Sequence, residues 1–389
     1  MRILVYEFVT GGGLAGRPVP RSLAREGLAM RSALLEDLAA IDGHTIVSTT
    51  DAQFARPVPR GVELVRIVGR ATAPHRAGAV GTPPDGPPGE PDRARPTFET
   101  FDSLVNECDA VWLIAPETDC CLERLAARVE RSGKILLGSG TAAVRMASDK
   151  SRLPRRLARI GIAYPETSIL TPGASARIAA RRIGYPVVVK PARGAGCRGV
   201  RLARHARELG VAIDAAHHAN GTGPGRRSST SEGGPGHRSS TSEGGPLLMQ
   251  RYVRGVAASV SLLADGHRAV PLSVNAQRVT AGPAFVYRGG STPLEHPIAA
   301  AAADAATRAC AAIPGLRGYV GVDLVLTEAG PLVIEVNPRL TLAYLGIRAV
   351  LEENVAALAL AACDGRLPSP LVPQRRARFT AAGRGVFLN

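Results

Sequence analysis

Short apolar runs alternate with segments of helical spacing through the first part of the chain. Residues 1–9 form a short apolar run, residues 21–41 carry apolar side chains at helical spacing, and residues 44–50 have the pattern of a second strand. The same alternation returns over residues 110–137. Strands that alternate with helices are typical of a largely parallel sheet covered by helices. The pattern therefore predicts an α/β domain over residues 1–140.

Two stretches interrupt this pattern. Residues 74–96 are rich in Pro and Gly and have no periodicity, which predicts a surface insertion. Within residues 219–246 a block of nine residues, 227–235, recurs unchanged as 238–246 and contains no apolar residue. A segment without apolar residues cannot build a core, so we expect a disordered insertion.

The remaining chain predicts a second α/β region in two parts. Helical spacing at residues 151–160 leads into strands and a first part over residues 141–255. Strands and helices continue in a second part over residues 256–365. The tail, residues 366–389, is basic and weakly patterned.

Residues 319–339 predict a β-hairpin with one apolar face. If the turn is centred on Ala329, cross-strand pairing places one apolar set on a single buried face: Val322, Leu324 and Leu326 opposite Val336, Ile334 and Leu332. The other face then carries Asp323 opposite Glu335, with Asn337 two residues further along the same strand.

These three oxygen-bearing side chains suggest a cation site. Cβ atoms of opposed residues lie about 4.5–5.5 Å apart, so the carboxylates of Asp323 and Glu335 repel each other unless a positive charge lies between them. With Asn337 they suit Mg²⁺, which takes one or two carboxylates and completes its shell with water and phosphates. Mn²⁺ is the alternative ion, and an exposed face with scattered acids is the alternative interpretation.

A glycine-rich segment follows the apolar strand that contains Lys190. Gly194, Gly196 and Gly199 match G-x-G-x-x-G, which is also the pattern of dinucleotide-binding loops. Such a loop opens a helix, whereas residues 200–203 continue as a short strand. We therefore predict a hairpin whose backbone amides close over phosphates, with the Lys190 ammonium directed at the same phosphates.

A third segment, residues 247–255, is an apolar strand that runs into a polar bend containing Gln250, Arg251 and Val253. Its position after the glycine loop makes it a candidate adenine-binding hinge. A plain strand and turn with a structural role is the alternative.

Composition sharpens the choice of charged residues. The chain has 389 residues, a net charge of +15 and 48 basic residues, of which only Lys134, Lys150 and Lys190 are lysine. A sequence that avoids lysine this strongly keeps it where a compact ammonium is needed, as on a phosphate oxygen. The basic residues are spread along the chain with few aromatic residues between them, which argues against specific nucleic-acid binding.

Other composition features narrow the class of protein. No apolar run is long enough to cross a membrane and no signal segment is present, so we expect a cytoplasmic protein. The six cysteines and eight histidines lack the spacing of zinc sites or a disulfide framework, so we expect reduced thiols and no transition metal.

Five motifs occur in the order found in ATP-grasp ligases, which the chain resembles over about residues 100–350. They are Ser148-Asp-Lys150, Val188-Val-Lys190-Pro with its glycine loop, Gln250-Arg-Tyr-Val253, Gly321-Val-Asp323 and Glu335-Val-Asn337-Pro-Arg339. The resemblance implies an N-terminal Rossmann-like pre-ATP-grasp domain, followed by a small lid subdomain and a metal-binding subdomain that hold ATP between them.

The resemblance also implies a role for each motif. It places Lys150, Lys190 and the loop glycines on the phosphates, Gln250, Arg251 and the Val253 backbone at the nucleotide base, and Asp323, Glu335 and Asn337 on magnesium. Many relatives have an acidic residue for the ribose after the hinge, where this chain has Val256, Ala257 and Ala258. The ribose contact is therefore left unassigned.

Within this superfamily the chain is most similar to the tyramine/L-glutamate ligases of methanofuran biosynthesis. The similarity rests on short motifs: Glu7-Phe-Val-Thr-Gly-Gly-Gly13, Ser259-Val-Ser261, Asn275-Ala-Gln277, Tyr287-Arg-Gly-Gly290 and Asn337-Pro-Arg339-Leu-Thr341. It implies an amide bond between L-glutamate and tyramine through an acyl phosphate, with Lys190 and Arg339 as catalytic residues and Arg278 as a second anion contact.

Alternatives to this activity are an amide or peptide ligase with other substrates and a catalytically silent nucleotide-binding module. The expected partners are small-molecule substrates, without specific nucleic acid or membrane, and a homo-oligomer is compatible with the sequence.

Overall fold

The computed structural model describes residues 1–67, 97–170, 176–194, 196–221, 245–383 and 385–388. The expected surface insertion at 74–96 and most of the repeat-containing segment at 219–246 lie outside these ranges. Residues 219–221, expected to belong to that segment, instead form the end of a helix.

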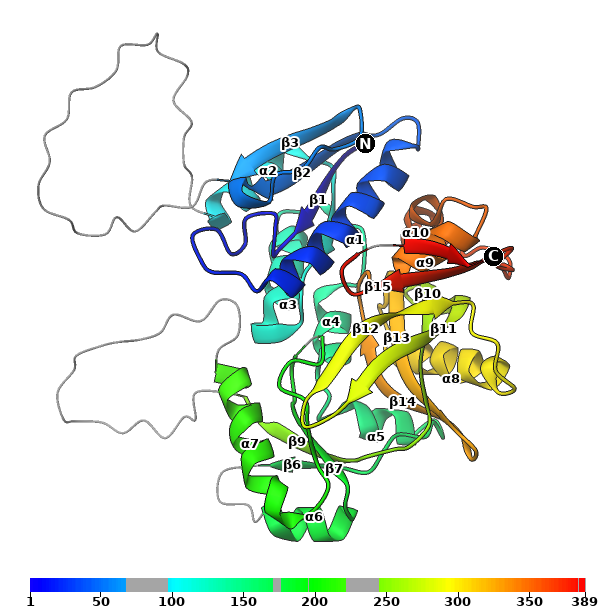
Figure 1. Ribbon diagram of the computed structural model, residues 1–389. Helices are drawn as coiled ribbons and strands as arrows, with labels where there is room; N and C mark the ends of the chain where they lie inside the picture. The colour runs from blue at the N-terminus through cyan, green and yellow to red at the C-terminus, as the bar shows by residue number, and fades with distance from the viewer. Residues whose placement is uncertain (68–96, 171–175, 195, 222–244, 384, 389) are drawn as a thin grey trace, which may run out of the picture.

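The N-terminal part is a five-stranded parallel sheet in the order β3-β2-β1-β4-β5 (Figure 1). This confirms the α/β pattern predicted from the alternating runs. Its elements are β1 (Arg2–Glu7), α1 (Arg21–Ala39), β2 (Thr45–Asp51), η1 (Ala52–Phe54), β3 (Val62–Ile67), α2 (Thr97–Glu107), β4 (Ala110–Ile114), η2 (Thr118–Cys120), α3 (Cys121–Arg131) and β5 (Ile135–Leu136).

A small sheet of four strands in the order β6-β9-β7-β8 follows, with two helices packed against it. Its elements are β6 (Thr167–Leu170), α6 (Ala176–Ile183), β7 (Val187–Pro191), β8 (Arg201–Ala203), α7 (Ala206–Gly221) and β9 (Leu247–Arg251). Strands β7 and β8 pair antiparallel, as predicted for the glycine-loop hairpin.

The third part is a seven-stranded antiparallel sheet in the order β14-β13-β10-β11-β12-β15-β16. Its elements are β10 (Val256–Asp265), β11 (Ala269–Ala281), β12 (Phe285–Thr292), α8 (Ala299–Ala311), β13 (Arg317–Thr327), β14 (Gly330–Asn337), α9 (Tyr344–Val350), α10 (Val355–Cys363), β15 (Arg376–Thr380) and β16 (Gly385–Leu388).

Two segments differ from the predicted organisation. Helices α4 (Thr141–Ser148) and α5 (Leu153–Ala158), expected with the small subdomain, pack in one apolar cluster with α8 and the seven-stranded sheet. The tail, expected to be weakly patterned, pairs β15 with β12 and buries Phe379. In both cases the burial of apolar side chains, each contributing about 1.5–3 kcal/mol, decides where the segment lies.

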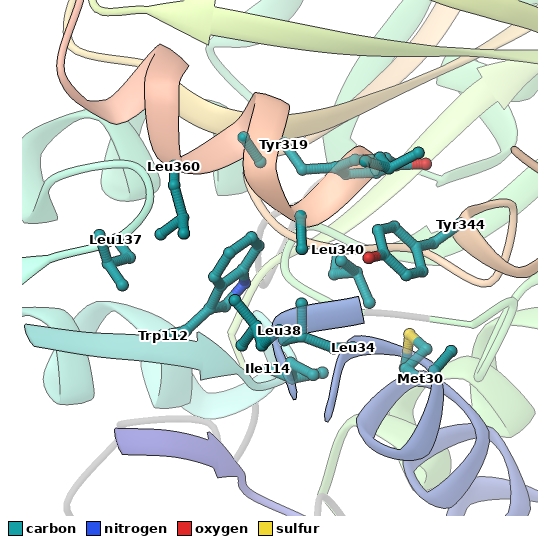
Figure 2. Close-up of a cluster of buried hydrophobic side chains, with 14 of the residues drawn as sticks. Met30, Leu34, Leu38, Trp112, Ile114, Leu137, Tyr319, Leu340, Tyr344 and Leu360 are labelled. Atoms are coloured by element: carbon teal, nitrogen blue, oxygen red, sulfur yellow. The ribbon is translucent and has the colours of Figure 1, made fainter. Parts of the chain in front are cut away.

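A further apolar cluster joins the N-terminal domain to the large sheet. Figure 2 shows Trp112 of β4, Leu38 of α1 and Leu360 of α10 pointing into it, and the rings of Tyr319 and Tyr344 meet edge to face with centroids 5.8 Å apart. Because these side chains come from both parts of the chain, the two domains share a core and have a fixed relative position.

Candidate functional site

The three oxygen-bearing side chains of the β13–β14 hairpin lie together. Asp323 is the cross-strand partner of Glu335, and Asn337 is the partner of Gly321. The Asn337 amide Nδ2 donates to Asp323 Oδ2 at 3.3 Å, and Gln277 Nε2 on β11 donates to Asp323 Oδ1 at 2.7 Å. The carboxylate of Asp323 is therefore oriented from both sides, by Asn337 on the adjacent strand β14 and by Gln277 on β11, which lies one strand beyond β10.

The predicted hairpin register is correct where Asp323 pairs with Glu335 and wrong toward the turn. From Leu324 onward the pairing shifts by one residue, so that Thr327 pairs with Gly330 and only two residues form the loop. A bulge in β14 absorbs the difference. As a result Val333 enters the core, whereas Ile334, predicted on the apolar face, lines a cavity beside Glu335.

Both candidate lysines approach this hairpin. Lys150 Nζ lies 3.1 Å from Glu335 Oε2 and donates to the Gly194 carbonyl at 2.7 Å. Lys190 Nζ donates to Gln250 Oε1 at 2.9 Å. Both lysines are buried. Two ammonium groups from separate parts of the chain thus converge beside the carboxylate pair, which gives a site suited to phosphate oxygens.

The charges in this site perturb one another. Burial, assisted by the nearby Glu335 charge, raises the pKa of Asp323. Burial acts in the same direction on Glu335, but Lys150 and Lys190 outweigh it and lower the pKa of that carboxyl. Burial lowers the pKa of Lys190 to about 8, against the opposing effect of Glu335. A cation between the carboxylates would keep both ionised.

The glycine loop connects β7 to β8 with backbone conformations that favour glycine. Gly196 and Gly199 have φ values of +66° and +74°. Gly194 and Gly196 line a cavity of about 250 Å³, which we call the hinge cavity, and Gly199 lines a neighbouring cavity of about 700 Å³. The chain continues into a strand, in agreement with our rejection of a dinucleotide-binding loop.

The polar bend after β9 forms another wall of the hinge cavity. Gln250, Arg251 and Val253 all line it, together with Lys150 and Lys190. Gln250 is buried, and its Nε2 donates to Thr167 Oγ1 at 3.0 Å. Arg251 pairs with Glu166 at 2.8 Å on the exposed side.

A third cavity, of about 530 Å³, lies between α1 and the β13–β14 hairpin, and we call it the α1 cavity. The hinge cavity and the α1 cavity are both lined by Asp323, Glu335 and Gln277. The carboxylate pair therefore lies at the junction of these two cavities. Asn337 lines the α1 cavity. The arrangement provides one compartment next to the lysines and glycine loop and another next to the N-terminal domain.

The two arginines singled out from the sequence have different positions. Arg339 lines the α1 cavity, but its Nε and Nη2 donate to both carboxylate oxygens of Glu117 at 2.9 and 3.0 Å. Arg278 is exposed at a bulge of β11 and lines none of the cavities described above. The bulge turns its side chain outward, so the structure does not bring Arg278 to the site.

Sequence reasoning assigned no individual role to Gln277 and Glu117. Gln277 lies two residues after Asn275 in the alternating strand β11, which could have placed both on one face. Glu117 lies three residues after the end of β4, at the edge of the parallel sheet where the carboxyl ends of strands meet. That position is the available signal for a functional side chain.

The described residues hold no group of three or more His, Cys, Asp or Glu side chains arranged for a metal. The candidate set of Asp323, Glu335 and Asn337 differs from such a group because its third member is an amide. In the same residues no helix has the length and apolar character needed to span a membrane.

Comparisons with known proteins agree with this geometry. Residues 147–343 match the family model of the ATP-grasp domain, and residues 90–144 match that of the pre ATP-grasp 3 domain. The first match alone covers half of the chain.

Curated relatives are similar over parts of their length. The chain is 30% identical over 222 residues to the carbamoyl phosphate synthase large chain of Rubrobacter xylanophilus, covering 56% of this chain and 19% of that protein. It is 37% identical over 101 residues to the tyramine–L-glutamate ligase of Methanocaldococcus jannaschii, covering 26% and 32%. The chain spans at most 39% of the length of the first curated relatives it matches.

A solved structure extends the likeness to the whole fold. An ATP-grasp superfamily protein from Archaeoglobus fulgidus superposes with a TM-score of 0.63 at 21% identity, covering 98% of this chain and 92% of that one. At this identity the likeness shows the fold alone.

Proposed function

The chain belongs to the ATP-grasp family, and on this premise we propose that it is an ADP-forming ligase that joins a carboxylate to an amine. The observation that carries the proposal is the convergence of Lys150 and Lys190 on the Asp323–Glu335 pair where two cavities meet. A nucleotide in the hinge cavity would direct its phosphates toward a carboxylate substrate in the α1 cavity.

The residues fit a divalent cation. Two opposed carboxylates and one amide oxygen are hard ligands, and the raised pKa of Asp323 indicates a carboxylate that lacks a counter-charge. We propose that Asp323, Glu335 and Asn337 hold Mg²⁺, with Mn²⁺ as an alternative. When bound, the ion neutralises negative charge on the nucleotide phosphates.

The proposed reaction has two steps. A carboxylate oxygen of the first substrate attacks the γ-phosphorus of ATP, giving an acyl phosphate and ADP. The amine nitrogen of the second substrate then attacks the acyl carbon, phosphate leaves, and the nitrogen loses a proton. In the first step Lys150, Lys190 and the glycine loop would hold the phosphate oxygens in line, so catalysis is mainly positioning and electrostatic stabilisation.

At the hinge, we propose that Gln250, Arg251 and the Val253 backbone bind the nucleotide base. Arg339 is retained as a positive charge facing the α1 cavity, where substrate would compete with Glu117 for it. Arg278 is dropped from the set because it is exposed.

For the substrates we propose L-glutamate and tyramine. The similarity to a tyramine–L-glutamate ligase and the shared short motifs support this pair. The alternative is another acid and amine in the α1 cavity.

The test is phosphate release from Mg-ATP across a panel of amino acids and amines, with mass analysis of the product. We expect release that needs both substrates and is lost in Lys190→Ala and Glu335→Ala. Nucleotide binding without phosphate release for any pair would overturn the ligase proposal and favour a silent nucleotide-binding module. Activity with other pairs but not with tyramine would overturn only the substrate assignment.

A further inference from the structure

The α1 cavity has an acidic, largely apolar wall opposite the β13–β14 hairpin. Glu26 and Glu7 both line it. The apolar part of the lining comes from α1, from the ends of β1 and β4, and from the large sheet: Val9, Leu23, Met30, Ile114, Val279 and Tyr287. A wall of this composition suits a ligand with an apolar body and a positive charge.

The two glutamates of this wall differ in their partners. Glu7 is buried and accepts hydrogen bonds from the Val9 and Thr10 backbone amides at 3.0 and 2.6 Å and from the Thr10 hydroxyl. The Glu7 carboxylate is therefore already hydrogen-bonded by neighbouring residues of the chain. Glu26 lies on α1 and lines the same cavity. It has no hydrogen-bond or ion-pair partner among the residues that the structure describes.

The positive charge that acts on Glu26 is already engaged elsewhere. Arg339 favours the ionised form of Glu26, but its guanidinium is paired in a bidentate manner with Glu117. Burial prevails over this attraction and raises the pKa of Glu26 to about 7. A partly buried carboxylate without a partner is costly to the fold, and a cation bound in the cavity would remove that cost.

We propose that Glu26 binds the ammonium group of the acyl acceptor, and that the α1 cavity selects a primary amine carried on an apolar, ring-sized body. This inference deepens the proposed function, since it names the residue of the same site that recognises the amine. A carboxylate beside the bound ammonium would lie next to Glu26 and be repelled by it, whereas Arg339, a cationic side chain that lines the same cavity, is left to the carboxylate substrate. The acceptor class is therefore an amine rather than an amino acid.

The experiment compares two probe molecules that share a phenylethyl group and differ in their polar group. Phenethylamine carries an ammonium group, and 2-phenylethanol carries a neutral hydroxyl in its place. By calorimetry at pH 7 we expect wild-type protein to bind the amine about 10-fold to 100-fold more tightly than the alcohol, the effect of one charge-assisted hydrogen bond. Phenylalanine, which adds a carboxylate, should bind more weakly than phenethylamine.

Variants assign the preference to the residue. Glu26→Gln should remove the preference for the amine, and Glu26→Asp should retain most of it. The control is Glu328→Gln, which changes an exposed glutamate in the β13–β14 turn that lines none of the cavities. A preference that survives Glu26→Gln, or a wild-type protein that binds both probes equally or neither, would overturn the inference.

The outcome is separable from that of the proposed function. Binding of the probes needs no turnover, so an amine preference without phosphate release would sink the ligase proposal alone. Ligase activity whose KM for the amine is unchanged in Glu26→Gln would sink the amine site alone. Correct folding of each variant is verified by a cooperative thermal unfolding transition at a temperature no lower than that of the wild type.

Discussion

Asp323 is held in one orientation by two amide donors that belong to different strands. Gln277 donates to one carboxylate oxygen and Asn337 to the other. Residues that hydrogen-bond to a metal-binding carboxylate, without binding the metal themselves, commonly control metal affinity. Gln277 therefore has a positioning role in the proposed magnesium site.

Replacing Gln277 tests this role. Gln277→Met keeps the length of the side chain and removes the donor, so we expect the Mg²⁺ concentration for half-maximal activity to rise about 10-fold or more. Titration of activity with Mg²⁺ measures it. Thr280→Val, at an exposed position of the same strand, is the control. Equal Mg²⁺ requirements in Gln277→Met and wild type would show that the hydrogen bond from Gln277 to Asp323 does not affect Mg²⁺ binding.

The Lys190 ammonium gives a pH dependence with a defined sign. Burial lowers its pKa to about 8, so in the free protein the charge is present below that pH and is lost as pH rises through it. We expect kcat/KM for ATP to fall above about pH 8, because kcat/KM reports the free enzyme. In Lys190→Arg the fall should move to higher pH. A flat profile up to pH 9 in the wild type would contradict the assignment.

The types of residue in the sequence predicted the site better than their spacing predicted its ion pairs. The scarcity of lysine drew attention to three positions, and the motifs around Lys150 and Lys190 selected these two. The third, Lys134, donates to the Asn106 carbonyl and lines none of the cavities described above. The ion pair between Arg339 and Glu117 could not be predicted, since its members lie 222 residues apart and depend on how two domains pack.

At the scale of elements, alternation predicted the parallel sheet and the hairpin, and it failed at the bulge of β14. Alternation assigns one face to every second residue, and a bulge breaks that rule by adding a residue on one strand. As a result Ile334 moves from the predicted core to the wall of the hinge cavity. The two loop residues, Glu328 and Ala329, are not the Asn-Gly or Asp-Gly pair that marks a two-residue hairpin loop, so the sequence did not reveal the shift in advance.

The glycine loop offers a test of backbone conformation. Gly196 has φ +66°, a region that costs other residues about 1–2 kcal/mol, whereas no positive φ occurs at Gly194. We expect Gly196→Ala to raise the KM for ATP by about 5-fold or more. Gly194→Ala, where an added Cβ would meet Pro191 at an ordinary 3.8 Å, should change it little. Equal effects of the two substitutions would exclude a role for this conformation.

At the scale of the whole molecule, the site depends on contacts between domains that are distant in sequence. Asp37 of α1 pairs with Arg348 of α9 at 2.6 Å and accepts a hydrogen bond from the hydroxyl of Tyr344, whose ring lies in the shared apolar cluster (Figure 2). Periodicity located the elements but not these partners, because packing between domains is decided by three-dimensional shape. The position of α4 and α5 against the large sheet was missed for the same reason.

The pair of Glu117 and Arg339 links the N-terminal domain to the end of the proposed metal hairpin, and both side chains are largely buried. Glu117→Leu would leave the guanidinium without its carboxylate, so we expect the free energy of unfolding to fall by about 3–5 kcal/mol, measured by denaturant titration. Asp102→Asn breaks the more exposed pair with Arg128 and should cost about 1 kcal/mol or less. If Glu117→Leu is no more damaging than Asp102→Asn, then Arg339 does not depend on Glu117, and its guanidinium is available to an anionic group of the substrate in the α1 cavity.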